Sequence, residues 1–145
     1  MSNGVGQFGG NGGTTFDFSN SNAITEVIVK SEGSAINLLK FKYYHDGTIS
    51  WSPDLGKDSG TSNQIALNYP NEFLTRIEGY YGPFSNIASL IRSLTFYTNL
   101  GKKYGPYGEE VGTHFDIPTK GAEIVGFFGR SGWLIDAIGV YLRAR

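Results

Sequence analysis

Three polar residues, Asp136, Asn37 and Arg92, each end a short segment of similar pattern. The segments read Gly-Trp-Leu-Ile-Asp at residues 132–136, Gly-Ser-Ala-Ile-Asn at 33–37 and Ala-Ser-Leu-Ile-Arg at 88–92. Their end groups differ in chemistry, since an ionised carboxylate only accepts hydrogen bonds, an amide donates and accepts, and a guanidinium only donates. A ligand that offers two protons to one side chain is therefore best received by Asp136.

A second motif, Gly-x-x-x-Gly-Thr, also occurs three times, starting at Gly9, Gly56 and Gly108. The starts lie 47 and 52 residues apart (9 to 56, then 56 to 108). One such loop alone indicates only a turn that needs positive φ. Two motifs that recur together indicate three structural repeats of about 50 residues. Because each repeat is too small to bury a core alone, the three must share one.

The composition excludes several kinds of site. There is no cysteine, and the two histidines, His45 and His114, are too few for a typical zinc centre. A net charge of −1 lacks the basic excess of a nucleic-acid binder. No apolar stretch approaches the length of a membrane span. The sequence thus predicts no metal, no cofactor, no nucleic-acid partner and no membrane partner.

The elements that must position these motifs are short strands. Glycine supplies 21 of 145 residues, roughly twice average usage, and turn residues separate β-rich runs at 27–29, 38–44, 48–51, 94–98 and 138–142. Asp46-Gly47 is a strong hairpin signal. Residues 87, 90, 91 and 94 fit a helix template, but the repeat aligns them with strand connections, so we expect a strand. The prediction is one all-β domain over residues 1–145.

Four separated motifs stand in a fixed order at residues 5–17, 91–96, 99–108 and 126–142. In type and order they resemble the jacalin-related lectins, and the resemblance covers nearly the whole chain. It implies a type I β-prism, in which three four-stranded Greek-key sheets are related by pseudo-threefold symmetry. It also implies carbohydrate binding without a metal ion.

The intact glycine loop and the lack of a secretory signal are similar to the mannose-specific subgroup. That resemblance implies mannose- or glucose-containing glycans as partners, a cytoplasmic location and a role in plant defence. Single-sugar affinity at a shallow site is weak, so the resemblance also implies a homo-oligomer, a dimer or tetramer, that binds multivalently.

The resemblance places the sugar between residues 132–136 and the Gly12-Gly13 pair. Asp136 is expected to accept the O4 and O6 hydroxyls. The N–H groups of Trp133 and Leu134 are expected to donate to O5 and O6, and that of Gly13 to O3. Glycine at 12 and 13 lets the sugar ring approach the backbone. An equatorial O4, as in mannose and glucose, suits Asp136, whereas the axial O4 of galactose does not.

Each of these residues also has a purely structural interpretation. Asp136 could end a strand or cap a turn, and Gly12 and Gly13 could be turn glycines. Trp133 could be a core aromatic, although its loop position favours the rim of the site, where its indole would contact further sugar units.

The repeat predicts a possible second sugar site at Ser34, Ala35, Asn37 and Gly60. Asn37 offers a single acceptor oxygen, so this site should be weaker, with partial compensation by Asp58. The third copy has Arg92 with Glu109 and Glu110 available to pair with it, and we expect no sugar there.

We consider three alternative functions for this sequence. The first is a non-catalytic lectin for mannose- or glucose-type glycans. The second is a protein-interaction module on a β-prism scaffold, since a fold alone does not fix function. The third is a glycoside hydrolase, which needs two facing carboxylates about 5–10 Å apart. The segment 132–136 supplies one carboxylate and its glycine partner loop supplies none, which disfavours the hydrolase.

Overall fold

The computed structural model describes residues 3–144, and within them the chain forms only β-strands, turns and loops. The predicted domain limits at residues 1 and 145 lie outside the described residues. The described strands assemble into three antiparallel sheets. The all-β, three-sheet prediction is confirmed.

Each sheet combines strands that are distant in the sequence. From edge to edge, the first runs β1 (Asn3–Gly9), β13 (Ile135–Arg143), β12 (Glu123–Ser131) and β2 (Thr14–Asp17). The second runs β5 (Thr48–Trp51), β4 (Ile36–His45), β3 (Ala23–Ser31) and β7 (Thr61–Ala66), with the short β6 (Leu55–Gly56) also paired to β4. The third runs β10 (Lys103–Gly108), β9 (Ile87–Thr98), β8 (Leu74–Phe84) and β11 (Thr113–Asp116).

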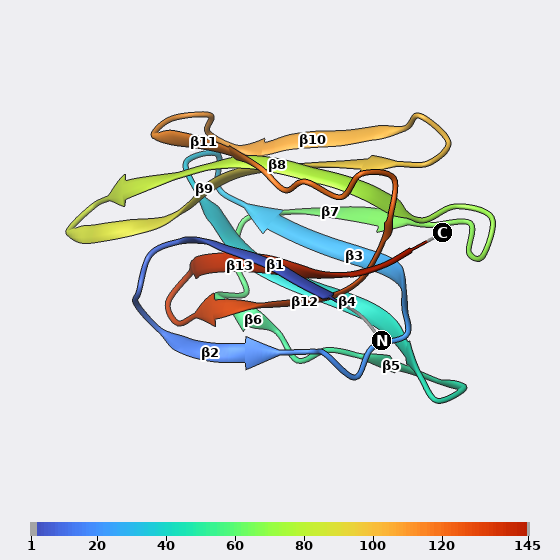
Figure 1. Ribbon diagram of the computed structural model, residues 1–145. Helices are drawn as coiled ribbons and strands as arrows, with labels where there is room; N and C mark the ends of the chain where they lie inside the picture. Colours follow the sequence, from blue (N-terminus) through green and yellow to red (C-terminus); the bar gives the residue numbers. More distant parts are fainter. Residues whose placement is uncertain (1–2, 145) are drawn as a thin grey trace.

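Each sheet is built on a long central hairpin, β12–β13, β3–β4 or β8–β9, with shorter strands at its edges. Figure 1 shows the third sheet at the top and the first sheet below it. The first sheet joins the beginning of the described chain to its end, because β1 pairs with β13. The predicted turn at Asp46-Gly47 joins β4 to β5, and its residues have φ of 49° and 82°, the two positive values that a type I′ hairpin turn requires.

A β-bulge stands at the same place in all three central hairpins. In the first sheet the register shifts so that Arg130 pairs with Ala137 and Ser131 with Ile135, which leaves Asp136 as the extra residue. The corresponding shifts in the other two sheets leave Asn37 and Arg92 as the extra residues. A bulge re-aims the extra side chain relative to its neighbours. The end position of each of the three segments (33–37, 88–92 and 132–136) is therefore set by backbone geometry.

The core is shared by the three repeats, as predicted. Each bulged strand has one inward-facing apolar residue before the extra residue and two after it. All nine of these residues are buried in one cluster: Ile36, Leu39, Phe41, Ile91, Leu94, Phe96, Ile135, Ile138 and Val140. The bulge adds one residue to the alternation, so inward positions on either side of it are three residues apart rather than two. This explains the three-residue spacing of Ile91 and Leu94, whereas Leu90 and Ile87 pack in a separate small cluster, and residues 87–94 form a strand, as expected.

Candidate functional site

The two repeated motifs meet in every repeat through one backbone hydrogen bond. The carbonyl of the bulged residue accepts from the N–H of the second residue of the Gly-x-x-x-Gly loop: Gly10 to Asp136 at 2.8 Å, Lys57 to Asn37 at 2.8 Å and Glu109 to Arg92 at 2.9 Å. The first glycine of each loop packs on the same carbonyl. A Cβ at Gly9, Gly56 or Gly108 would lie 2.3, 2.1 or 2.1 Å from that oxygen. These first glycines therefore serve the architecture.

The last glycine of each loop has an architectural reason too. Gly13, Gly60 and Gly112 have φ of 69°, 93° and 101°. A Cβ on any of them would fall 2.4 to 2.6 Å from a backbone oxygen of the neighbouring strand. The interpretation of Gly13 as a turn glycine is thus correct for its backbone, and this need is common to all three copies.

Gly12 differs from the other loop glycines. It is not among the residues with positive φ, and a Cβ on it would meet only the side chain of Asp136, 2.6 Å from Oδ2. Its counterparts in the other two loops are Ser59 and Val111. The backbone thus tolerates a side chain at this position, and glycine here leaves the carboxylate open.

Asp136 is buried, with 7% of its surface exposed. Its Oδ1 atom has no hydrogen-bond partner among the described residues. Burial raises the pKa of this carboxyl above its ordinary value, and the charge of Arg130 lowers it in part. An unsatisfied buried acceptor costs roughly 1–3 kcal/mol, and such a cost is typical of a group kept for binding.

The predicted backbone donors are also free. Within residues 3–144, the N–H groups of Gly13, Trp133 and Leu134 donate no backbone hydrogen bond. The structure brings both loops together, since a Cβ on Gly132 would lie 3.1 Å from the Gly13 Cα and 3.7 Å from Asp136 Oδ1. Gly12, Gly13 and Asp136 therefore border one place, and Trp133 and Leu134 lie in the segment that joins Gly132 to Asp136.

The side chains of Trp133 and Leu134 have opposite surroundings. Trp133 is 53% exposed, so it is not a core aromatic. Its ring lies 6.4 Å from that of Phe84, and the Lys57 Nζ lies 5.8 Å from its centroid. Leu134 is buried with Ala35 and Leu90 in a small apolar cluster. These three are the third residues of the segments 132–136, 33–37 and 88–92, so the segments meet at one end of the molecule.

Sequence reasoning missed Arg130. This residue of β12 donates from Nε to the Gly12 carbonyl and from Nη2 to the Gly13 carbonyl, both at 2.9 Å. It lies within the motif at residues 126–142, but on the strand two residues before the loop, so the loop pattern did not single it out. Its counterparts by strand register are Lys30 and Tyr80.

In the second copy, around residues 33–37, the backbone has the same bulge, but the Asn37 side chain is already hydrogen-bonded. Asn37 Oδ1 accepts from the Glu32 N–H at 3.2 Å, and Asn37 Nδ2 donates to Ser59 Oγ at 3.0 Å. Asp58 forms an ion pair with Lys30. Next to this copy lies a cavity of about 130 Å³ that Ser34 and Ala35 line together with Trp133. Ser34, Ala35 and Asn37 thus line one cavity, with the Asn37 amide already hydrogen-bonded, whereas Gly60 lines a different cavity.

In the third copy, the Arg92 side chain is bound by groups of the protein itself. Arg92 donates to the Ser34 carbonyl at 2.8 Å and to the Pro83 carbonyl at 2.6 Å, and it pairs with Glu109 at 3.0 Å. The pairing with Glu109 was predicted. Its guanidinium also lies 5.2 Å from the Phe84 ring centroid.

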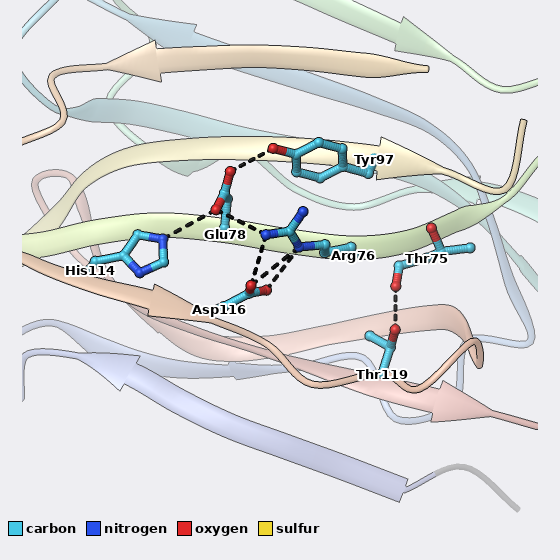
Figure 2. A network of polar contacts seen from close by, with 7 residues as sticks. All are labelled: Thr75, Arg76, Glu78, Tyr97, His114, Asp116 and Thr119. Atoms are coloured by element: carbon cyan, nitrogen blue, oxygen red, sulfur yellow. Dashed lines mark hydrogen bonds and ion pairs between the residues drawn. The ribbon is translucent and has the colours of Figure 1, made fainter. Parts of the chain in front are cut away.

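A separate polar network lies on the third sheet (Figure 2). Arg76 on β8 holds Asp116 on β11 through a forked pair of hydrogen bonds, the shortest 2.8 Å. Glu78 accepts from the Tyr97 hydroxyl at 2.5 Å and lies 3.1 Å from His114 Nε2. The Tyr97 hydrogen bond is the largest cause of a lowered pKa at Glu78. The network joins three strands of this sheet.

Two kinds of feature are absent from the described part of the chain. Among residues 3–144 there is no cluster of three or more His, Asp or Glu residues that could hold a metal ion. The same residues include no helix long and apolar enough to span a membrane.

Comparison with known proteins bears on family and fold. A family model described as "Jacalin-like lectin domain" matches residues 5–141. Jacalin-related lectin 3 of Arabidopsis thaliana is 40% identical over 97% of this chain, which spans only 24% of the length of that relative.

Two solved structures are similar along almost their whole length. AcmJRL, a mannose-binding jacalin-related lectin from Ananas comosus, has a TM-score of 0.92 and 37% identity, covering 99% of each chain. A mannose-specific jacalin-related lectin from Morus nigra, solved in complex with mannose, has a TM-score of 0.88 and 39% identity, covering 98% of this chain and 94% of that one. The fold is therefore the β-prism of these lectins, and the chain belongs to the jacalin-like lectin domain family.

Proposed function

We propose that this chain is a non-catalytic lectin domain that binds mannose- or glucose-type glycans at the Asp136 site. The observation that carries the proposal is a buried carboxylate oxygen with no partner among the described residues, beside loop N–H groups that are also free. This set combines an acceptor for hydroxyl protons with donors for ring and hydroxyl oxygens. The mannose-binding character of the similar structures supports the same ligand class.

The site binds a pyranose through its O3–O6 edge. Asp136 accepts from O4 and O6, the N–H groups of Trp133 and Leu134 donate to O5 and O6, and the Gly13 N–H donates to O3. Charge-assisted bonds to Asp136 are about twice as strong as neutral ones. An axial O4 would leave one carboxylate lone pair unpaired at a cost of roughly 1–3 kcal/mol, which disfavours galactose.

The finer parts of the proposal extend beyond this site. We expect a second, weaker site at Ser34, Ala35, Asn37 and Gly60, and no sugar at Arg92. Weak single sites imply multivalent binding through a dimer or tetramer. The cytoplasmic location, the role in plant defence and the lack of catalysis stay predictions.

Replacing Asp136 tests the function directly. Asp136→Ala should weaken methyl α-mannoside binding about 100-fold or more, because it removes two hydrogen bonds to a charged group of roughly 1.5–3 kcal/mol each. It should not lower the free energy of unfolding, since the described residues leave Oδ1 unpaired. Titration calorimetry and urea unfolding measure the two quantities.

Two further variants complete the test. Glu110→Ala removes an exposed carboxylate of the third loop, where no sugar is expected, and should leave affinity unchanged. Gly12→Ala places a methyl group against Asp136 and should abolish binding while the fold is kept. Unaltered mannoside binding by Asp136→Ala would refute the assignment. A glycan array without binding, together with specific capture of a protein partner, would favour the interaction-module alternative.

A further inference from the structure

We infer that Arg130 is a positioning residue of the Asp136 site, which fixes the Gly12–Gly13 backbone and so aims the Gly13 N–H. The inference rests on the proposed function, because the group that it aims is the predicted donor to the sugar. Its evidence lies in contacts that no sequence motif marks.

The first step concerns the peptide unit between Gly12 and Gly13. A peptide unit is planar, and in its trans form the C=O and the N–H point in opposite directions. The bond between these glycines is not among the cis peptides. Arg130 Nε holds the Gly12 carbonyl at 2.9 Å. It thereby directs the Gly13 N–H, which belongs to the same peptide unit, away from the guanidinium.

The second bond fixes the same loop from the next peptide. Arg130 Nη2 donates to the Gly13 carbonyl at 2.9 Å. Two parallel donors on a rigid planar fork define both the position and the tilt of what they bind, and an ammonium group lacks this property. Glycine backbone is mobile when unsupported. Arg130 thus supplies the rigidity that Gly12 and Gly13 lack.

The repeats provide an internal comparison. Arg130, Lys30 and Tyr80 occupy equivalent registers, opposite Ala137, Leu38 and Ser93. Lys30 pairs with the Asp58 side chain, and Tyr80 lies with its ring 5.1 Å from that of His114. Neither binds the carbonyls of its loop among the described hydrogen bonds. The fork is therefore not a general need of the loop, and it accompanies the one copy with a free carboxylate.

The third step is electrostatic. Burial raises the pKa of Asp136, and Arg130 is the charge that opposes this rise. The other cations on elements packed nearby are otherwise engaged. Arg92 binds two carbonyls and Glu109, and Lys57 lies over the Trp133 ring. Without Arg130 the carboxyl would hold its proton to higher pH, and protonation removes acceptor capacity and the charge that strengthens its hydrogen bonds to hydroxyls.

Two substitutions distinguish the effect of the forked hydrogen bonds of Arg130 from the effect of its positive charge. Arg130→Met keeps the aliphatic stem and removes both, whereas Arg130→Lys keeps the charge and removes the fork. We would measure methyl α-mannoside affinity at pH 7 by calorimetry, and the titration of the Asp136 carboxyl carbon by NMR in the ligand-free protein. Circular dichroism monitors the fold, and Lys103→Met, an exposed lysine on β10, is the control.

Arg130→Met should weaken binding at least tenfold and raise the NMR midpoint of Asp136. Arg130→Lys should weaken binding at least threefold and raise the NMR midpoint of Asp136 by less than Arg130→Met does. Lys103→Met should have the mannoside affinity and the Asp136 midpoint of the wild type. If Arg130→Met binds equally well, or if the Asp136 midpoint does not move, the positioning role is overturned while the proposed function stands. If the wild type itself does not bind the mannoside, the proposed function fails and this role with it.

Discussion

Asp136, Asn37 and Arg92 occupy one backbone position in three copies, and their side chains decide what each copy can bind. Each is the extra residue of a bulge, and each carbonyl is held by the facing glycine loop. Asp136 has an unpaired oxygen, the Asn37 amide is bonded to Ser59 and Glu32, and Arg92 is committed to two carbonyls and Glu109. Binding capacity therefore varies while the scaffold stays constant.

The second copy should gain strong sugar binding from two substitutions. Ser59 stands where the first loop has Gly12, and its hydroxyl bonds to the Asn37 amide. Asn37→Asp alone would leave a carboxylate that this hydroxyl can still satisfy. Asn37→Asp with Ser59→Gly should raise affinity at the second site at least tenfold, because a free carboxylate accepts from two hydroxyls. Titration calorimetry would show stoichiometry rising from near one toward two methyl α-mannosides per chain.

The single variants are the matched controls for this experiment. Each should bind more weakly at the second site than the double variant. A wild-type protein that already binds two sugars with equal affinity would contradict the reasoning, because the Asn37 contacts would then have no effect on binding.

The sequence singled out the residues of the first candidate site but not the contacts that hold their loops. Asp136 and the Gly12-Gly13 pair stood out because each belongs to a repeated pattern, and the structure brings them together. Arg130 and the bond from Asn37 to Ser59 could not be found this way. Both depend on which side chains cross from a strand to a loop, and such pairing is set by sheet register rather than by spacing along the chain.

At the scale of elements, the bulge links the fold to the site. It shifts the inward alternation by one residue, so that Ile91 and Leu94 both enter the core while Arg92 turns out of the strand. The same shift turns Asp136 toward its glycine loop. The spacing of these apolar residues suits a helix as well as a bulged strand, and only the comparison of repeats favoured the strand.

The network on the third sheet should make stability depend on pH. Tyr97→Phe removes the hydroxyl that donates to Glu78 and should lower the free energy of unfolding by about 1 kcal/mol at pH 7. Because the pKa of Glu78 is lowered in the folded protein, its contribution is present above the unfolded pKa of about 4.3 and is lost as pH falls through the folded pKa. Urea unfolding at pH 7 and at about pH 3 measures both values.

Tyr80→Phe is the control for that substitution. Tyr80 lies on β8 in the same sheet and its hydroxyl forms no hydrogen bond among those described, although its ring contacts His114. Its removal should leave stability unchanged at both pH values. If Tyr97→Phe were equally destabilising at pH 3 and pH 7, its effect would come from packing and not from the Glu78 carboxylate.

At the scale of the whole molecule, the three repeats are joined at the end that carries the site. Ala35, Leu90 and Leu134 are equivalent residues that pack together, and Phe84 and Ile87 lie against them. The repeat predicted a shared core, and the structure confirms it. The sequence did not predict that the third residues of the segments form a cluster of their own, because the cluster joins positions about 44 to 99 residues apart.

This cluster should couple a distant residue to sugar binding. Leu90 belongs to the third copy, where we expect no sugar, yet it supports Leu134, whose N–H is a predicted donor. Leu90→Ala should lower the free energy of unfolding by about 2–5 kcal/mol through the cavity that it leaves. It should also weaken methyl α-mannoside binding severalfold, because the Trp133–Leu134 backbone loses its support. Urea unfolding and calorimetry on the folded variant measure the two effects.

Leu74→Ala is a matched control because it separates stability from site geometry. Leu74 and Leu90 are both fully buried, so the two substitutions should cost similar stability. Leu74 begins β8, whereas Phe84 ends that strand beside Trp133, and an 11-residue strand spans about 35 Å. Leu74→Ala should therefore leave mannoside affinity unchanged. Equal loss of affinity in both variants would mean that binding follows global stability, and that the cluster at this end of the prism has no separate role.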